Sequence, residues 1–399
     1  MAREYDVIIV GAGMVGALTA VLTAQKGLTV ALIDKHSGRY PLSTPPAYDA
    51  RVSAISALSQ TLLEQAGAWQ CIAKERLAPY QRMAVWDGLG DGYVDFDVRY
   101  QQAASLGQLV ENAALCDALM KSVHDTRGID LYFDDAVASH QEQESGVEVV
   151  LASDRSLRGA VLIAADGANS NLRQQNNVDT VEWDYGHHAI VTTVEIDAAH
   201  EDTAWQAFGE EGILAFLPMP SVADKHYVSI VWSVSPADAE QLMALEEDAF
   251  CRRLTYAINR RFTALSLTVP RMAIPLRQRH AKHYVQPGFV LIGDAAHTIH
   301  PLAGQGANLG FADVSALVPI LVKAHQRGDM LGSLKILRRY QRARMLDNIA
   351  MSASMEAFKR VFTTQQPAVV QLRNLGLKLC HKSPSIKQKL VAHAAGLNQ

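Results

Sequence analysis

Near its start the chain reads Tyr5-Asp-Val-Ile-Ile-Val10-Gly11-Ala-Gly13-Met-Val-Gly16, in which an apolar, β-branched run leads into three spaced glycines. Such a run is typical of a buried parallel strand. Behind it, Gly11 permits a tight turn, Gly13 lets the backbone approach a pyrophosphate, and Gly16 allows a helix to pack closely on the strand. The spacing therefore predicts a dinucleotide-binding turn.

The residues that follow complete a strand–helix–strand unit. Residues 17–24 contain neither Gly nor Pro and predict a helix, and residues 28–33 predict a second strand that ends at Asp34. Free N–H groups and the positive end of the helix would hold the phosphates. The carboxylate of Asp34 would accept hydrogen bonds from both ribose hydroxyls of an adenosine.

A second motif lies far along the chain, where it reads Leu291-Ile-Gly293-Asp294-Ala-Ala-His297-Thr-Ile-His300-Pro301-Leu-Ala-Gly304-Gln-Gly306-Ala307-Asn308. Asp294 ends a predicted buried strand, where a carboxylate meets sugar hydroxyls rather than water. The alternative role for this residue is a helix cap. The chain would thus hold one cofactor from two distant parts of its sequence.

The end of the second motif predicts a helix over residues 307–324. Gly304 and Gly306 permit close backbone approach at its start. The N–H groups of Ala307 and Asn308 belong to the positive end of this helix and would point at a ligand. The Asn308 side chain can equally serve only as a cap.

Composition favours a globular enzyme. The 399 residues leave room for two domains, and neither the 20% of charged residues nor the apolar runs suggest disorder or a membrane span. The first strand leaves no space for a signal peptide. The four cysteines lack CxxC spacing, which favours reduced packing residues of a cytoplasmic protein. A net charge of −4 argues against nucleic-acid binding, and no cluster has metal-ligand spacing.

Between the two motifs the pattern becomes mainly antiparallel. Residues 83–87 and 93–97 alternate around a glycine-rich turn, which predicts a hairpin. Strands separated by turns continue from residue 183 to residue 276, interrupted by a helix predicted over residues 240–258. Because the strand at 289–292 returns to the first pattern, we expect a substrate-binding sheet inserted into a nucleotide-binding domain.

The motifs Gly11–Gly16, Asp166-Gly167 and Gly293-Asp294 resemble those of the single-component FAD-dependent aromatic hydroxylases, the para-hydroxybenzoate hydroxylase type. The resemblance covers nearly the whole chain. Arg51-Val-Ser-Ala-Ile and Glu211-Gly-Ile-Leu-Ala-Phe-Leu-Pro218 are most similar to the ubiquinone-biosynthesis hydroxylases of bacteria, and within these to enzymes that hydroxylate C5 of a polyprenylphenol.

The resemblance implies an α/β fold with a Rossmann-like FAD-binding domain of the GR2 type, an inserted mainly antiparallel sheet and a C-terminal helical region. We expect the FAD-binding domain in three segments, residues 1–75, 111–180 and 281–350. Residues 76–110 would form antiparallel strands of the substrate domain, residues 181–280 the substrate-binding domain, and residues 351–399 the C-terminal helical region.

The resemblance also implies roles for single residues. Asp294 would hold the ribityl chain of FAD, and the N–H groups of Ala307 and Asn308 would face the N1–C2 carbonyl of the flavin. Arg51 would contact the FAD phosphates or assist flavin movement, with a surface salt bridge as the alternative.

The same likeness implies roles at Val137, at Asp166-Gly167 and at Pro301. A main-chain group at Val137 would hold adenine, and Asp166-Gly167 would serve FAD and the nicotinamide cofactor. Plain packing and a strand-end turn are the respective alternatives. Pro301 would shape an oxygen pocket, or form only a rigid turn. Apart from the likeness, and only because these residues lie near the motifs, His300, or His188 in its place, would contact the substrate, although a lone histidine is more often structural.

The implied chemistry belongs to the cofactor. NADH or NADPH would reduce FAD, O2 would form a flavin C4a-hydroperoxide, and an electron-rich phenol would take the distal oxygen. Apolar residues of the middle sheet would recognise the substrate or, at their period of two, form core; these are Ile213, Leu214, Phe216 and Trp232.

The C-terminal region is basic, with seven Lys and Arg side chains against the single acid Glu356 from residue 351 onward. It is either an amphipathic surface for a membrane or a partner protein, or a helical region that packs on the body with solvated lysines. The overall expectation is a hydroxylase of a lipid-tailed phenol in ubiquinone biosynthesis, cytoplasmic or peripheral to the inner membrane, alone or in a biosynthetic complex. The alternatives are a hydroxylase of a soluble aromatic compound and a flavin-bound assembly subunit.

Overall fold

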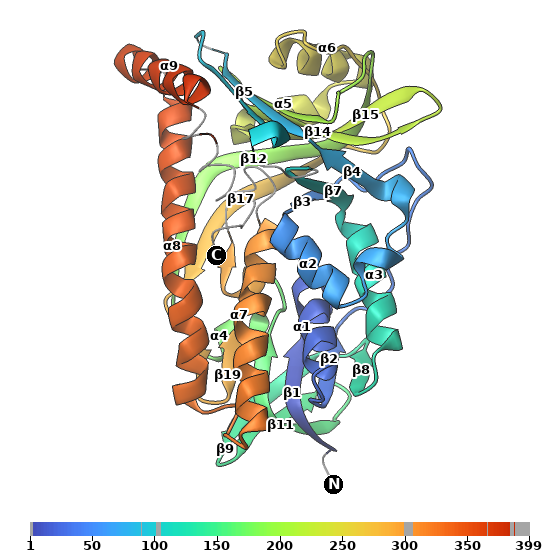
Figure 1. Ribbon diagram of the computed structural model, residues 1–399, viewed down its shortest axis with the longest axis vertical. Coiled ribbons are helices and arrows are strands. Elements are labelled where there is room, and N and C mark those ends of the chain that lie inside the picture. Colours follow the sequence, from blue (N-terminus) through green and yellow to red (C-terminus); the bar gives the residue numbers. More distant parts are fainter. Residues whose placement is uncertain are drawn as a thin grey trace.

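The computed structural model describes residues 3–88, 90–100, 105–298, 306–364, 366–383 and 387. His300, Pro301 and Gly304 therefore lie outside the described residues. Figure 1 shows an elongated molecule with one sheet near each end, and a long helix, α8 (Leu334–Thr363), running along one side between them.

The first sheet contains the N-terminal strand and has the order β18-β19-β11-β1-β2-β8. Its central pairs β11–β1, β1–β2 and β2–β8 are parallel. Val7, Ile8 and Ile9 are fully buried, as expected for a strand covered on both faces. The strands are β1 (Arg3–Val10), β2 (Val30–Asp34), β8 (Ile129–Phe133), β9 (Val137–Gln143), β10 (Gly146–Leu151), β11 (Ser156–Ala164), β18 (Val285–Gln286) and β19 (Phe289–Leu291).

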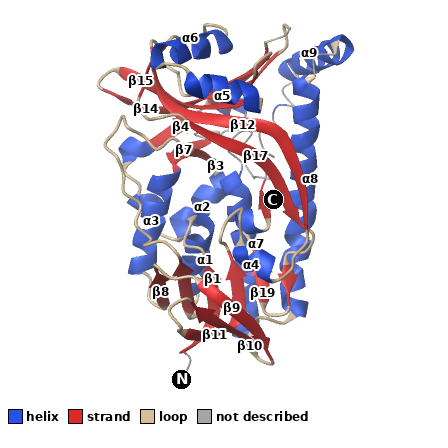
Figure 2. Ribbon diagram, turned by 180° about the vertical axis from the view of Figure 1, so that it is seen from behind, coloured by secondary structure: helices blue, strands red, loops and turns tan. Residues whose placement is uncertain are grey.

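Helices cover one side of this sheet, and the β9–β10 hairpin folds back on the other, as the two opposite views in Figures 1 and 2 show. The helix after the glycines, α1, is buried along nearly its whole length. The helices of this part are α1 (Met14–Ala24), α2 (Ala57–Gln65), α3 (Asn112–Asp125), α4 (Asn171–Gln175) and α7 (Gly306–Gln326).

The second sheet is mainly antiparallel, with the order β20-β17-β12-β15-β14-β13-β5-β6. The expected hairpin of residues 83–97 forms β5 and β6, and β5 joins this sheet through a parallel pair with β13. The strands are β5 (Arg82–Asp87), β6 (Tyr93–Asp97), β12 (Thr180–Ile196), β13 (Thr203–Gly209), β14 (Gly212–Val222), β15 (Lys225–Val234), β16 (Ala264–Leu267), β17 (Met272–Ala281) and β20 (His297–Thr298).

The two faces of the second sheet differ in what covers them. The outer face packs under α5 (Pro236–Ala244) and α6 (Glu247–Ala257). The inner face packs on a small sheet of β3 (Val52–Ile55), β7 (Gly107–Glu111) and β4 (Leu77–Tyr80). The predicted α/β architecture with an inserted antiparallel sheet and a C-terminal helical region is confirmed.

The prediction of a single helix over residues 240–258 is wrong, because the helix is interrupted at Leu245 and the segment forms two helices, α5 and α6. Leu245 is extended, and the Arg271 guanidinium donates to the carbonyl oxygens of Leu242 and Leu245 at 2.7 and 2.6 Å. A side chain distant in sequence thus satisfies the carbonyls at the end of α5, which no local pattern could reveal.

The C-terminal helical region begins earlier than expected, because α8 starts at Leu334, and it ends in α9 (Pro367–Lys382). Part of its basic charge is buried. Arg373 forms a two-bond ion pair with Asp87 in β5, at 2.5 and 2.8 Å, and Lys387 donates to Asp95 in β6 at 2.6 Å. These two cations attach the region to the second sheet and are not solvated.

Among the described helices, α7 alone has the length and hydropathy of a membrane span. However, 61% of its apolar window is buried inside the protein, and the fully buried Asp313 lies within it. The helix packs against α1 and α8 as part of the core around the first sheet.

Candidate flavin-binding site

The glycine-rich turn has the shape that its spacing predicts. Gly11 has a φ of +104°, and a side chain there would overlap the carbonyl of Ala165 at the end of β11. At Gly16, a side chain would overlap the carbonyl of Gly11. A Cβ on Gly13 would meet no atom of the described residues within 4 Å, its own chain neighbours aside, although Gly13 precedes the first turn of α1. The turn is therefore closed toward the protein and open where a pyrophosphate would approach the helix.

Asp34 lies beside this turn. Its Oδ2 accepts a hydrogen bond from the Ala12 N–H at 2.6 Å, and its Oδ1 accepts one from the His36 N–H at 2.8 Å. The Tyr40 hydroxyl donates to the Ala12 carbonyl at 3.2 Å. The Asp34 carboxylate thus fixes the turn, and its oxygens keep lone pairs for the ribose hydroxyls predicted from the sequence.

Asp166 and Gly167 follow β11 at the edge where β1 ends, so they lie next to the glycine turn. Asp166 Oδ2 accepts from the Leu172 N–H at 3.3 Å. Its Oδ1 is buried without a hydrogen-bond partner among the described residues. An oxygen of this kind is costly unless a ligand or water satisfies it, which fits a role at a cofactor site.

Arg173, in α4, is a functional candidate that the sequence reasoning missed. Its guanidinium donates to the carbonyl oxygens of Ala168 and Ala295, both at 2.9 Å, and its side chain is nearly fully buried. Burial lowers its pKa, and the neighbouring Arg279, which also donates to Ala168, adds to that effect. Arg173 therefore joins the Asp166 and Asp294 motifs directly.

The Gly293–Asp294 turn carries the chain from the first sheet to the second, because β19 precedes it and β20, which pairs with β17, follows it. Gly293 has a φ of +58°, and a Cβ there would press on Val15 of α1 at 3.2 Å. The second motif therefore packs directly against the helix that the first motif begins.

The Asp294 carboxylate is accessible to solvent, yet protein atoms crowd around it. The resulting desolvation raises its pKa; His297 opposes the shift and Asp313 adds to it. An accessible acid at a strand end, with its charge disfavoured by its surroundings, is suited to hydrogen bonds with ligand hydroxyls.

The Asn308 side chain is not available to a ligand. Its Oδ1 accepts from the Ser56 N–H at 3.0 Å and the Ser59 hydroxyl at 2.7 Å, and its Nδ2 donates to Ala54 at 2.7 Å. It joins the first turn of α7 to the segment after β3 rather than acting as a helix cap. The first N–H groups of α7, including that of Ala307, have no acceptor within the helix itself.

Arg51 directly precedes β3, and Val137 is the first residue of β9. The Arg51 guanidinium is exposed, with no ion pair among the described residues. Burial raises the pKa of Cys116 to about 12, and the charge of Arg51 opposes that rise, so the two groups are close. Val137 begins β9, two residues after Asp135, whose N–H donates to the Asp34 carbonyl at 3.2 Å.

The assignment of Leu214, Phe216 and Trp232 to the substrate is corrected by the structure. All three side chains are at most 1% exposed and pack under α5 and α6 on the outer face of the second sheet. Ile213 is on the inner face, but it packs against Phe362 of α8 and Leu377 of α9. Of the two roles weighed from the sequence, core packing is the one these side chains have.

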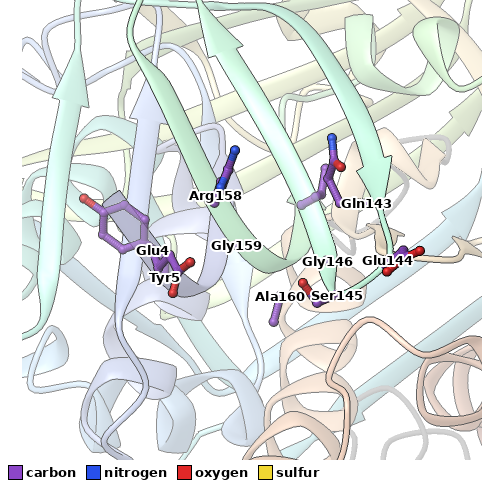
Figure 3. Close-up of a pocket in the computed structure, with 10 residues that line it drawn as sticks. Glu4, Tyr5, Gln143, Glu144, Ser145, Gly146, Arg158, Gly159 and Ala160 are labelled. Carbon is purple, nitrogen blue, oxygen red and sulfur yellow. The ribbon is translucent and has the colours of Figure 1, made fainter. Parts of the chain in front are cut away.

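A surface recess shown in Figure 3 lies away from these motifs. Its lining includes Glu4, Gln143 and Arg158, which lie near the start of β1, at the end of β9 and in β11. Ligands of open α/β sheets bind beyond the carboxyl ends of the parallel strands. Glu4 belongs to the amino end of β1, so this recess is not the cofactor site.

The chain belongs to the FAD binding domain family, whose profile matches residues 4–351. It is a FAD-dependent monooxygenase, an oxidoreductase that acts on an aromatic ring. It is 36% identical over 398 residues to the 3-demethoxyubiquinol 3-hydroxylase of Escherichia coli (strain K12), with 99% of each chain covered. It is also 33% identical to the ubiquinone biosynthesis monooxygenase COQ6, mitochondrial, of Xenopus tropicalis, over 98% of this chain and 93% of that one.

Solved structures share the fold. The p-nitrophenol 4-monooxygenase PnpA of Pseudomonas putida DLL-E4 has a TM-score of 0.79 at 18% identity, covering 100% of this chain and 99% of that one. PqsL of P. aeruginosa, in complex with 2-aminobenzoylacetate, has a TM-score of 0.77 at 22% identity, covering 94% and 100%. At these identities the likeness concerns architecture and not substrate.

Proposed function

We propose that this protein uses NADH or NADPH and O2 to hydroxylate the aromatic ring of a polyprenylphenol in ubiquinone biosynthesis, with FAD as its cofactor. The observation that carries the proposal is the convergence of four distant segments, at Gly13, Asp34, Asp166 and Asp294, beyond the carboxyl ends of one parallel sheet. The names of the full-length relatives supply the pathway.

The residues present fit FAD. Gly13 and the start of α1 would hold the pyrophosphate, Asp34 the adenosine ribose, and Asp294 the ribityl hydroxyls. The N–H groups at the start of α7 would stabilise negative charge on the flavin. FAD, when bound, supplies the exchange of hydride with the nicotinamide and the activation of oxygen.

Three further predictions from the resemblance remain part of this proposal. Arg51 would contact the phosphates, since its guanidinium is exposed, close to α3 and without an ion pair among the described residues. Val137 would hold adenine through its main chain, and Asp166-Gly167 would serve both cofactors. Pro301, His300 and Gly304 keep their predicted roles, outside the described residues. The domain boundaries remain a proposal, and two strands cross them: β3 pairs with β7, and β20 pairs with β17 of the second sheet.

The inner face of the second sheet is the proposed substrate wall. Small apolar side chains lie where this face meets the small sheet, because Ala54 and Ala78 of the small sheet cluster with Ala204 and Leu217 of the second sheet. Ala215 and Val231 are half-buried there, beside Tyr80 of β4. Small residues on the face toward the FAD-binding domain leave room for a ring, and an apolar wall excludes the water that would compete with ring hydroxylation.

Tyr80 is the polar group of this wall. Burial raises its pKa to about 12, so the hydroxyl stays protonated at neutral pH. It would donate a hydrogen bond to a phenol oxygen while its ring contacts the apolar part of the substrate.

The exposed side of α9 is the proposed membrane-binding surface, through which the protein would reach a lipid-tailed substrate. Leu372, Leu375 and Leu379 are 68%, 54% and 58% exposed, at a spacing that places them on one side of the helix. Lys382 is exposed beside them, and Figure 1 shows α9 at the outer end of α8. Exposed leucines with a cation suit the interface of an anionic bilayer.

Vesicle flotation tests this surface. Replacing Leu372, Leu375 and Leu379 together by Ser should abolish binding to anionic phospholipid vesicles, while Leu346→Ser, at an equally exposed leucine of α8, should not. If the wild-type protein does not bind vesicles but co-purifies with other ubiquinone-biosynthesis enzymes, the assembly-complex alternative is favoured.

A measurement of turnover with candidate phenols tests the main proposal. The purified holoprotein is supplied with NADH or NADPH, O2, and either a prenylated phenol or a soluble phenol, and cofactor oxidation is compared with hydroxylated product. Product from the prenylated phenol supports the proposal, and product only from soluble phenols overturns the substrate. No phenol-stimulated flavin reduction favours an assembly role.

The ring position requires a separate measurement. The sequence resemblance favours C5, whereas the relative at 36% identity is named a 3-hydroxylase. Quinone intermediates that accumulate in a deletion strain identify the missing hydroxyl. We propose C5, and an intermediate that lacks the hydroxyl at position 3 instead would overturn that choice.

A further inference from the structure

A buried ionic cluster lies behind the Gly293–Asp294 turn, between α7, α8 and the second sheet. Asp313 of α7 is fully buried, and His297, Arg344 and Asn348 around it are at most 4% exposed. Arg344 Nε donates to Asp313 Oδ1 at 3.0 Å, and Arg344 donates onward to Asn348 at 2.7 Å. Asp313, Arg344 and Asn348 lie outside the motifs that suggested the cofactor, whereas His297 follows Asp294 within the second motif.

The other oxygen of Asp313 holds the turn itself. Oδ2 accepts a hydrogen bond from the Gly293 N–H at 3.0 Å and lies 2.6 Å from His297 Nε2. Asp313 thereby links Arg344 of α8 to the residue that precedes Asp294. Gly293 is also in the left-handed region and pressed against Val15, so its position is tightly determined.

Stability alone is a poor explanation for this cluster. Burial raises the pKa of Asp313, but His297, Arg344 and the Gly293 N–H together outweigh burial and hold it below its usual value, so the carboxylate is charged. Replacing a buried ion pair by apolar residues is often neutral or stabilising. A charged residue in the middle of an otherwise apolar helix therefore needs another reason.

We propose that Asp313 is a positioning residue of the flavin site, which holds the Gly293–Asp294 turn so that the Asp294 carboxylate faces the bound FAD. The inference rests on the proposed cofactor. The affinity for FAD would then depend on a charged residue that contacts neither the glycine turn at Gly11–Gly16 nor the ligand.

The test compares two buried Asp–Arg pairs. Asp313→Asn neutralises the carboxylate behind the turn, and Asp87→Asn neutralises the equally buried partner of Arg373 in β5, at the far edge of the second sheet. Breaking either pair leaves a buried arginine uncompensated and should lower the unfolding temperature. Only Asp313→Asn should also weaken FAD binding, by at least tenfold, measured by flavin fluorescence on titrating the apoprotein well below its unfolding temperature.

The outcomes separate the two levels of inference. Wild-type apoprotein that does not bind FAD would refute the proposed cofactor site itself. Wild-type binding with equal FAD dissociation constants in the two variants would refute only the positioning role. If Asp313→Asn does not fold, His297→Gln removes the imidazole that lies 2.6 Å from Oδ2 and keeps the Gly293 bond. It should raise the dissociation constant by a smaller factor, and an unchanged constant would overturn the proposal.

Discussion

Arg173 donates to the Ala295 carbonyl at 2.9 Å, although 122 positions separate the two residues. The same guanidinium donates to Ala168 at 2.9 Å. One buried cation therefore determines the distance between the turn after Asp166 and the turn at Asp294. The cofactor site depends on this link as well as on the glycine turn, because it connects two turns that are far apart in the sequence.

Replacing Arg173 by Lys should weaken FAD binding and lower stability. A single ammonium cannot reproduce a planar fork that reaches two carbonyls, and an unsatisfied buried carbonyl costs about 1–3 kcal/mol. Titration of the apoprotein with FAD and thermal unfolding measure the two effects. Arg158→Lys is the control, because Arg158 forms an exposed pair with Glu148 and should change neither quantity. Full FAD affinity in Arg173→Lys would contradict the assigned role.

Gly13 and Gly16 should respond differently to the same change. Gly16→Ala should destabilise the apoprotein, because the added methyl overlaps the Gly11 carbonyl. Gly13→Ala should leave apoprotein stability within about 0.5 kcal/mol, because no atom of the described residues beyond its chain neighbours lies near the new methyl. It should still raise the FAD dissociation constant at least tenfold. Unfolding of the apoprotein and flavin titration separate the two, and unchanged binding in Gly13→Ala would place the pyrophosphate elsewhere.

The two faces of β14 should separate stability from substrate recognition. Phe216→Ala should cost about 3–5 kcal/mol, since it empties a fully buried site under α6. Ala215→Leu, on the half-buried inner face, should instead raise the KM for the phenol several-fold with a smaller loss of stability. Denaturant unfolding and steady-state kinetics provide the comparison. A KM unaffected by Ala215→Leu would move the substrate away from this wall.

Acidification should destabilise the protein through His280. Burial lowers the pKa of His280 below its ordinary value of 6.5, with His297 adding to the shift. The unfolded chain therefore binds more protons than the folded one as the pH falls from about 7 to about 5, and the free energy of unfolding decreases over that window. His280→Gln should flatten the decrease, measured by denaturant unfolding at each pH, whereas the exposed His124→Gln should not. If the free energy of unfolding depends on pH as steeply in His280→Gln as in the wild type, His280 is not the group responsible.

Local patterns determined the strand–turn–helix unit at Gly11–Gly16, the strand that ends at Asp34 and the helix α7. Each depends on backbone geometry and periodicity within a few residues, which the sequence carries directly. The antiparallel hairpin of β5 and β6 followed from alternation around glycines for the same reason. The family resemblance extended these elements to a flavin site.

Tertiary structure decided the rest. Period-two alternation separates Ala215 from Phe216, but only packing under α5 and α6 shows which of them faces the FAD-binding domain. Arg173, Asp313 and Arg373 look in the sequence like ordinary charged helix residues. Their roles come from carbonyls and carboxylates brought to them by distant segments, because a buried charge requires a partner and the fold alone supplies it.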